Sequence, residues 1–176
     1  MFSNLVIMII EWLSACFCHY MIALYLKYIP GNIFLNSTVF SISEALSILF
    51  SHILFIKVGF RICLFTCFAI AFFSLILLML TETFELISIV PFFVMGSKIG
   101  ISSAYASVYL ANVRTFPTEH LGTMFGICNV VGRSSTVFAP LVAELPSPAP
   151  LIVAVILCGI SAAAALQLQA MNDGKR

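Results

Sequence analysis

The chain has 176 residues, of which 62% are hydrophobic and 9% are charged, and its formal net charge is +1. Soluble domains contain about 45 to 50% apolar residues, so this composition is that of an integral membrane protein. Lys and Arg form no cluster outside short loops, which excludes a nucleic-acid-binding protein.

The reactive side chains do not form a recognisable catalytic or metal-binding motif. All 6 cysteines fall inside apolar runs, where thiols behave as small hydrophobes, and their spacings lack companion ligands. No nucleophile and base are arranged with an orienting group. We therefore expect no disulfide framework, no metal site, no cofactor and no enzymatic activity.

Apolar runs long enough to cross the roughly 30 Å hydrocarbon core recur between short breaks that carry Pro, Gly or charge. The sequence predicts an all-α membrane protein with a single six-helix domain over residues 1–176. Linkers this short make neighbouring helices antiparallel. The helices are expected at about residues 4–26, 33–56, 62–80, 86–113, 121–143 and 151–170.

The basic residues favour one orientation in the bilayer. If both termini lie on one side, that side holds five basic residues and the opposite side holds Lys27. Cytoplasmic loops carry the excess of Lys and Arg, so both termini are expected in the cytosol. The first run lacks a basic start and contains Glu11, which favours a retained helix over a signal peptide. The five residues are Lys57, Arg61, Arg114, Lys175 and Arg176.

The second span carries a polar stripe. Ser37, Ser41, Glu44, Ser47 and Ser51 follow one another at helical spacing and therefore share one face of the helix. Such a face does not point at lipid. Two interpretations remain open. The stripe lines a water-accessible path with Glu44 near its middle, or its serines form hydrogen-bonded helix contacts.

Small residues recur at four-residue intervals in the fourth and fifth spans. Gly96, Gly100 and Ala104 belong to the fourth span, and Gly122 and Gly126 belong to the fifth. Small side chains at this spacing let two helix backbones approach closely. The sequence therefore predicts tight helix packing at both places.

Arg133 lies near the middle of the apolar run 121–143. A guanidinium at the centre of a membrane helix costs roughly 2.5 to 3.5 kcal/mol on insertion scales, so it should face a partner, a cavity or a ligand. Contact with a substrate, a gating role and a buried ion pair with Glu44 or Glu11 are three open explanations.

Further polar residues accompany Arg133. Asn129, Thr136 and Pro140 lie on its side of the helix, and Pro140 can bend the helix there. Lys98 is a second cation within a span, although its long stem allows the ammonium to reach towards the bilayer surface.

Two runs carry a resemblance to a known family: Gly96-Ser-Lys-Ile-Gly-Ile-Ser-Ser-Ala-Tyr-Ala-Ser-Val-Tyr-Leu-Ala-Asn-Val-Arg-Thr-Phe-Pro-Thr118 and Gly132-Arg-Ser-Ser-Thr-Val-Phe-Ala-Pro140. They resemble the tenth and eleventh helices of the organic cation and anion transporters in the major facilitator superfamily. Trp12 with His19-Tyr20 resembles the seventh helix, and Glu44 resembles the acidic residue of the eighth. The resemblance covers essentially the whole chain with the second half of that fold.

The resemblance implies a site. Arg133 matches a position where anion-preferring members carry Arg and cation-preferring members commonly carry Asp, which implies a preference for organic anions. A guanidinium can hold a carboxylate or sulfate with two parallel hydrogen bonds. Lys98 matches a basic residue of the central cavity in relatives. The other positions that line this cavity in relatives match Trp12, His19, Phe34, Glu44 and Tyr105.

The chain departs from the family pattern at the cytoplasmic ends of the helices. Ile56, just before the loop Lys57-Val-Gly-Phe-Arg61, and Phe60 within it replace charged residues of the family. Further along the chain, Arg114 replaces a Glu and Leu121 replaces an Arg. In the family these charges are thought to latch the helix ends during alternating access. We expect a local pair of Arg114 with Glu119 as a replacement, although exposed pairs contribute about 0 to 1 kcal/mol.

A complete family member has two halves that rock about a central site, and 176 residues provide one. The sequence therefore predicts a truncated or half-length transporter-like protein of the plasma membrane that carries small organic ions, preferably anions. Its expected partners are a second six-helix half or another copy of itself. The alternative is a membrane protein that does not transport and instead pairs with a full-length transporter to regulate it.

Overall fold

The computed structural model describes residues 2–29, 31–84 and 89–168, and within these ranges it contains helices and no strands. The all-α prediction is confirmed. Two short 3-10 helices, η1 (Leu26–Tyr28) and η3 (Thr136–Phe138), continue α1 and join α5 to α6. The α-helices are α1 (Phe2–Tyr25), α2 (Ile33–Val58), α3 (Phe60–Phe84), α4 (Val90–Thr115), α5 (Leu121–Ser135), α6 (Ala139–Ala143) and α7 (Ala149–Ala165).

Each predicted span corresponds to a helix of the structure, with α5, η3 and α6 together forming the fifth. The expected start of the fourth helix, Leu86, lies outside the described residues. The prediction for the last helix was too long, because α7 ends at Ala165 and a turn follows. Arg61 Nη2 donates a hydrogen bond of 2.6 Å to the carbonyl oxygen of Leu166 at this end. A cation placed there satisfies a free helix carbonyl and complements the helix dipole.

Pro140 breaks the fifth span. Its ring nitrogen has no hydrogen to donate, and the chain tightens into η3 just before it, where the Ala139 N–H bonds to the Thr136 carbonyl. Pro140 then occupies the first turn of α6. The expected perturbation of the helix by Pro140 is confirmed, as a break between two helices.

Four described segments are long and apolar enough to cross a membrane: Phe2–Tyr28, Ile33–Val58, Phe60–Thr81 and Leu121–Ala143. The apolar helix α7 is shorter, and α4 has sufficient length but is rich in serine and glycine. A helix enclosed by its neighbours does not need apolar residues on every face, because small and hydroxylic residues pack well between helices. The chain is a helical membrane protein.

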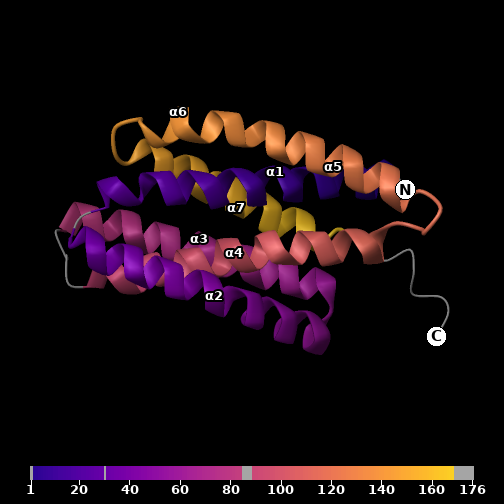
Figure 1. Cartoon of the computed structure of the whole chain (residues 1–176), viewed down its shortest axis with the longest axis horizontal. Helices are drawn as coiled ribbons and strands as arrows, with labels where there is room; N and C mark the ends of the chain where they lie inside the picture. The colour runs from indigo at the N-terminus through magenta and orange to yellow at the C-terminus, as the bar shows by residue number, and fades with distance from the viewer. Residues whose placement is uncertain (1, 30, 85–88, 169–176) are drawn as a thin grey trace.

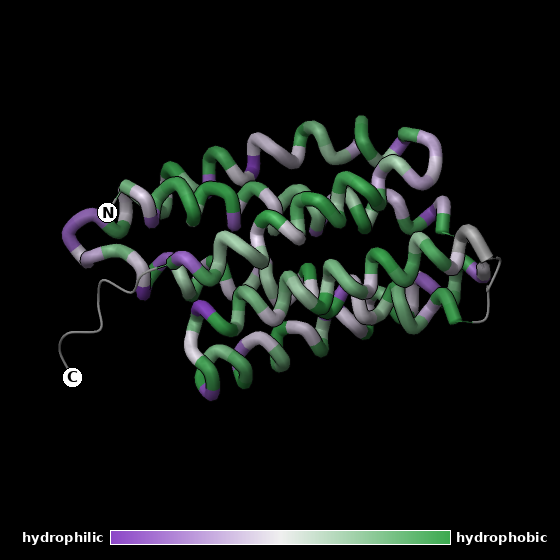
Figure 2. The backbone as a smooth tube through the Cα atoms, turned by 180° about the vertical axis from the view of Figure 1, so that it is seen from behind, coloured by the Kyte–Doolittle hydropathy of each residue, from purple (hydrophilic) through white to green (hydrophobic). Residues whose placement is uncertain are grey.

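The helices form one bundle in which α4 is central (Figure 1). It packs between α2 and α3 and also contacts α1, whereas α7 packs against α3 and α1. The broken helix α5–η3–α6 packs mainly on α1. Figure 2 shows apolar residues along most of each helix and hydrophilic residues mainly near the helix ends.

Close backbone contact between α3 and α4 depends on Gly100. A Cβ atom at this position would lie 2.6 Å from the backbone nitrogen of Ala71 and 2.8 Å from the carbonyl oxygen of Cys67. Gly96 meets the side chain of Ser74 in the same way. The tight packing predicted for the glycines of the fourth span is confirmed.

The glycines of the fifth span behave differently. No heavy atom lies within 4 Å of a Cβ placed at Gly122 or Gly126, so the prediction of tight packing there was wrong. The fifth span instead approaches α1 at Gly132, where a Cβ would lie 3.2 Å from the carbonyl oxygen of Trp12. Sequence spacing identified small residues but could not show which of them face another helix.

The polar stripe of α2 divides into two parts. Ser47 and Ser51 are buried, and the Ser103 hydroxyl of α4 donates a hydrogen bond of 3.0 Å to the Ser47 carbonyl oxygen. The Ser41 hydroxyl is at the surface and bonds to the Ser37 carbonyl within its own helix. The helix-contact interpretation therefore holds for the second half of the stripe, and the first half and Glu44 remain accessible.

An exposed ion pair joins the end of α1 to the loop between α6 and α7. Lys27 Nζ lies 2.6 Å from Glu144 Oε1, and the Tyr28 hydroxyl donates to the other carboxylate oxygen. The predicted pair of Arg114 with Glu119 is not formed among the ion pairs of the described residues. The compensation expected for the lost cytoplasmic charges is therefore wrong in this conformation.

We expect Gly100→Ala to lower the free energy of unfolding by about 1 to 3 kcal/mol, because the added methyl group must push the α3 backbone away. Gly126→Ala is the matched control, since its methyl group meets open space. Unfolding of the purified variants in detergent micelles, followed by circular dichroism, measures the difference. Equal stability of the two variants would contradict the close α3–α4 contact.

The Lys27–Glu144 contact predicts a pH dependence of stability. The hydrogen bonds from Lys27 and Tyr28 lower the pKa of Glu144 below its ordinary value of 4.5. The stabilisation is therefore complete above pH 4.5 and is lost as the pH falls through the lower pKa of the folded state. The difference in melting temperature between wild type and Lys27→Met should shrink over this range. Lys57→Met, which alters an exposed lysine at the end of α2, should show no such change.

Candidate functional site

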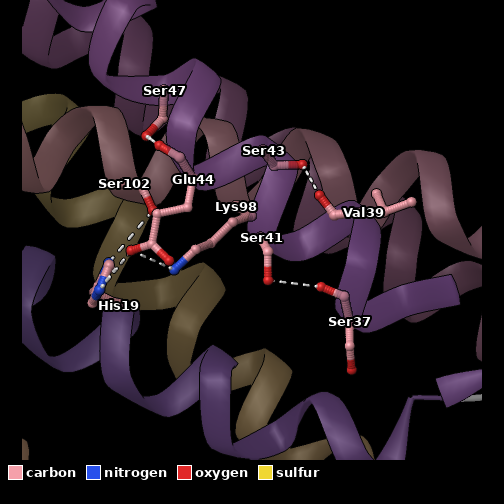
Figure 3. A network of polar contacts seen from close by, with 9 residues as sticks. All are labelled: His19, Ser37, Val39, Ser41, Ser43, Glu44, Ser47, Lys98 and Ser102. Carbon is pink, nitrogen blue, oxygen red and sulfur yellow. Dashed lines mark hydrogen bonds and ion pairs between the residues drawn. The ribbon is translucent and has the colours of Figure 1, made fainter. Parts of the chain in front are cut away.

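An ionic cluster joins three helices in the middle of the bundle (Figure 3). Glu44 of α2 places Oε1 3.5 Å from Lys98 Nζ of α4 and 3.4 Å from His19 Nε2 of α1. The Ser102 hydroxyl of α4 lies 3.5 Å from the other ring nitrogen of His19, Nδ1. One carboxylate thus connects α1, α2 and α4.

The two charges of this cluster differ in exposure. The Lys98 side chain is 1% exposed, whereas the Glu44 side chain is 45% exposed. Burial of an ammonium group is costly unless it is paired, and Lys98 is paired on two sides. The Glu44 carboxylate is one partner. The second is the Phe40 ring, whose centre lies 4.1 Å from the Lys98 Nζ atom. The long stem of Lys98 therefore does not carry the ammonium to the bilayer surface, because its partners lie inside the bundle.

A continuous set of ring contacts extends from His19 to the fifth span, and we call it the aromatic row. The His19 ring stacks on Tyr105 with centroids 4.8 Å apart and planes inclined by 20°. The Tyr105 and Tyr109 hydroxyls lie 3.0 Å apart, and the Tyr109 ring lies 4.5 Å from Trp12. Trp12 in turn contacts the Phe125 ring edge-on.

Helical periodicity explains the row. Tyr105 and Tyr109 are one turn apart on α4, and Trp12 and His19 are two turns apart on α1. Each pair therefore lies on one face of its helix, and the packing of α1 on α4 places these faces together.

Arg133 lies beside the aromatic row, near Tyr105 and Tyr109. Its Nε donates a hydrogen bond of 2.8 Å to Asn129 Oδ1 of the preceding turn. Among the described residues it has no carboxylate within ion-pair distance. The predicted alternative of an ion pair with Glu44 is therefore wrong, since that carboxylate is held by Lys98 and His19.

The other predicted counter-ion is also wrong. Glu11 is fully buried, and neither of its carboxyl oxygens has a hydrogen-bond partner within the described structure. Arg133 remains an exposed cation with a neutral partner.

The structure brings six of the seven predicted site residues together, in or beside the aromatic row: Arg133, Glu44, Lys98, Trp12, His19 and Tyr105. Phe34 is the exception. It lies in the first turn of α2, where Asn32 caps the helix, and it is 81% exposed. Ten helical residues, about 15 Å, separate it from Glu44.

Four residues of the site were not predicted from the sequence, and the helical spacing of three of them would have identified them. Tyr109 follows Tyr105 by one helical turn, Ser102 follows Lys98 by one turn, and Phe40 precedes Glu44 by one turn. Extending each predicted residue by four positions would have found them. The fourth, Phe125, depends on how α5 packs on α1, and its spacing gives no indication.

No group of three or more His, Cys, Asp or Glu side chains able to hold a metal ion occurs within the described ranges. A separate surface groove of about 480 Å³ lies among α1, α5, α6 and α7 and is lined almost entirely by apolar side chains such as Leu13, Phe17 and Val142. None of the seven predicted site residues lines this groove.

Comparison with known proteins gives one informative similarity. No protein-family model matches the chain. Over 156 residues, 88% of the chain, it is 26% identical to the Caenorhabditis elegans protein named "Putative transporter B0252.3". The chain spans 31% of that relative's length. It is thus similar to part of a protein whose name describes a transporter.

Removal of the Glu44 charge should destabilise the domain, because Lys98 would remain buried without a counter-ion. We expect Glu44→Gln to cost about 1 to 3 kcal/mol, less than a fully buried pair because Glu44 is partly exposed. The double variant Glu44→Gln/Lys98→Met should recover part of this loss, as a double-mutant cycle of unfolding free energies would show. Glu119→Gln, at an exposed loop position, is the neutral control. Additive effects of the two substitutions would contradict the pairing.

Proposed function

We propose that this domain belongs to a secondary transporter of the major facilitator type and binds small organic anions at the aromatic row. The observation that carries this proposal is Arg133, an exposed guanidinium whose hydrogen-bond partner is a neutral side chain. The similarity to a protein named as a transporter and the apolar helices support a transport role in a membrane. We place this activity at the plasma membrane.

The charges along the row favour an anion. Lys98 and Glu44 neutralise each other at one end, whereas Arg133 has no acidic partner among the described side chains. The row therefore has an excess positive charge beside it at Arg133. A guanidinium binds carboxylate, sulfate or sulfonate groups with two parallel hydrogen bonds, so an anionic ligand group is expected beside Arg133.

The rings of the row favour an aromatic or flat apolar body on the same ligand. The partly buried rings of Tyr105 and Tyr109 lie between Arg133 and the ionic cluster, and the fully buried Trp12 packs against Tyr109. Stacked or edge-to-face ring contacts contribute about 0.5 to 1.5 kcal/mol each beyond the burial of area. We infer a substrate class of small aromatic anions.

A second half completes the site in this proposal. Transporters of this type rock two halves about a site near the bilayer midplane, and the chain corresponds to 31% of its longer relative. Glu44 and Arg133 are both accessible at the surface of this domain. We propose that another six-helix half, or a second copy of the chain, covers them.

The binding site can be tested with the chain's one tryptophan, because Trp12 belongs to the row. Benzenesulfonate should change the Trp12 fluorescence of the purified chain in lipid vesicles, and the uncharged benzenesulfonamide should bind much more weakly. Arg133→Gln should raise the dissociation constant for the sulfonate about 10- to 100-fold, the value of a charged hydrogen bond.

Arg114→Gln removes a cation from the end of α4, away from the row, and serves as the charge-matched control. It should leave the dissociation constant unchanged. The proposal fails if no aromatic anion changes the wild-type fluorescence, or if Arg133→Gln binds as well as wild type. Uptake of radiolabelled benzenesulfonate into the same vesicles then tests transport directly.

A specific observation favours the second candidate, a membrane protein that pairs with a full-length transporter and regulates it. Gly122 and Gly126 form a small-residue face of α5 that meets no other part of the described domain. Such faces suit close contact with a helix of another protein. Co-purification distinguishes the two candidates. Recovery of the chain together with a larger transporter, and its loss in Gly126→Leu, would support regulation. Recovery of the chain as a homodimer would support a transport site formed by two copies.

A further inference from the structure

Glu11 is an ionisable residue that the aromatic row does not use. It lies near the middle of α1, its side chain is fully buried, and both carboxyl oxygens lack a hydrogen-bond partner within the described structure. An ionised carboxylate buried without a partner costs so much free energy that the group takes up a proton instead. In this conformation the Glu11 carboxyl is therefore neutral.

Glu11 belongs to a buried polar face of α1, a helix that packs on α7. Glu11, Ser14 and Cys18 lie at successive turns of one face of α1, and the thiol of Cys18 interacts with that of Cys158 on α7. Cys158 also acts electrostatically on Glu11. Ser161 follows Cys158 by one turn on the buried face of α7, and the hydroxyls of Ser14 and Ser161 have no hydrogen-bond partner in the described residues. We call these five residues the α1–α7 polar contact.

No cation neutralises Glu11 from the neighbouring elements that the structure describes. Arg114 is exposed in the last turn of α4, the other described cations of the elements packed around α1 and α7 have partners of their own, and α6 and η3 carry no charged residue. The thiol of Cys158 on α7 is the titratable group that acts on Glu11. The other partners are Glu44 for Lys98 of α4, Asn129 for Arg133 of α5, the Leu166 carbonyl for Arg61 of α3, and Glu144 for Lys27 of η1.

We propose that the α1–α7 polar contact is a proton-binding site centred on Glu11 and that the proton is the coupling ion of the proposed transport. The claim that the proton is the coupling ion rests on the proposed function, whereas the proton-binding site does not. The reaction is a simple protonation: a proton from water forms an O–H bond with the Glu11 carboxylate, and the same bond breaks when the proton returns to water. A hard metal cation takes about six or more oxygen ligands, whereas the contact offers one carboxyl group and two hydroxyls.

The position of Glu11 on α1 connects the proton to the substrate site. Glu11 and Trp12 are consecutive, so they point to different sides of the helix, and Trp12 points towards Tyr109 of the aromatic row. Loss of the proton leaves a bare charge in the α1–α7 contact, which favours separation of the helices and entry of water. Displacement of α1 then moves Trp12 and His19 relative to α4. Proton binding and anion binding are therefore coupled, and each strengthens the other.

Infrared spectroscopy of the full chain in phosphatidylcholine vesicles tests the proton site without any transport assay. The wild type should show the C=O stretch of a protonated carboxylic acid at neutral pH. Glu11→Gln should lack this band and should fold normally, because the amide has the shape and neutrality of the protonated acid. Glu119→Gln, at an exposed loop position, should keep the band.

Three results of the infrared experiment would overturn the proton site. They are absence of the band in the wild type, its persistence in Glu11→Gln, and its removal by sodium chloride at constant pH, which would indicate a sodium site. Circular dichroism and Trp12 emission verify that each variant is folded.

Uptake of benzenesulfonate tests the coupling, because this ion stays charged at all relevant pH values and does not follow a proton gradient passively. An inward proton gradient should stimulate uptake by the wild type and by Glu119→Gln, and Glu11→Gln should lose the stimulation. If the wild type shows the carboxylic acid band but neither binds nor takes up benzenesulfonate, the proposed function is rejected and the proton site stands. If the proton gradient does not change benzenesulfonate uptake and the wild type lacks the infrared band, the proton site is rejected and the proposed function stands.

Discussion

The arrangement of the domain depends on one carboxylate. Glu44 is the counter-ion of Lys98, an ammonium group that the bundle encloses almost completely. Without this pairing, α4 would carry an unpaired charge into the interior between α2 and α3, at a cost of about 1 to 3 kcal/mol. Because Glu44 also reaches His19, the same carboxylate fixes α1 beside α4. The aromatic row follows from this placement, since its residues come from the facing surfaces of these two helices.

The position of each charge determines the chemistry that the surface offers. Lys98 is a buried cation that is paired with Glu44 and packed on the Phe40 ring. It stabilises the packing of the helices, and its charge is not available to a ligand. Arg133 has a hydrogen bond to Asn129 and remains accessible, so its charge is available. A surface with flat rings and one accessible guanidinium suits an organic anion with an aromatic body. The proposed substrate class follows from this difference between two cations.

Helix α1 has different polar groups on two sides. One side carries Trp12 and His19 in contact with α4, and the other carries the buried Glu11, whose carboxyl has no partner in the described structure. A neutral carboxyl is compatible with the α7 contact, whereas a charged one is not. The helix is therefore well placed to respond to a proton on one side with a movement on the other, and a rigid α-helix can transmit such a movement over its length.

The amino-acid sequence by itself determined the membrane class, the order of the helices and the break at Pro140, because apolar run length and the missing proline N–H are local properties. It also identified most of the residues of the row, partly through a family resemblance. The tertiary structure decided which polar residues meet. Spacing in one helix cannot show that Glu44 binds Lys98 and leaves Arg133 unpaired, that Gly126 faces open space, or that Glu11 is enclosed. These outcomes depend on how helices distant in sequence rotate against one another, and that rotation is set by packing over the whole bundle.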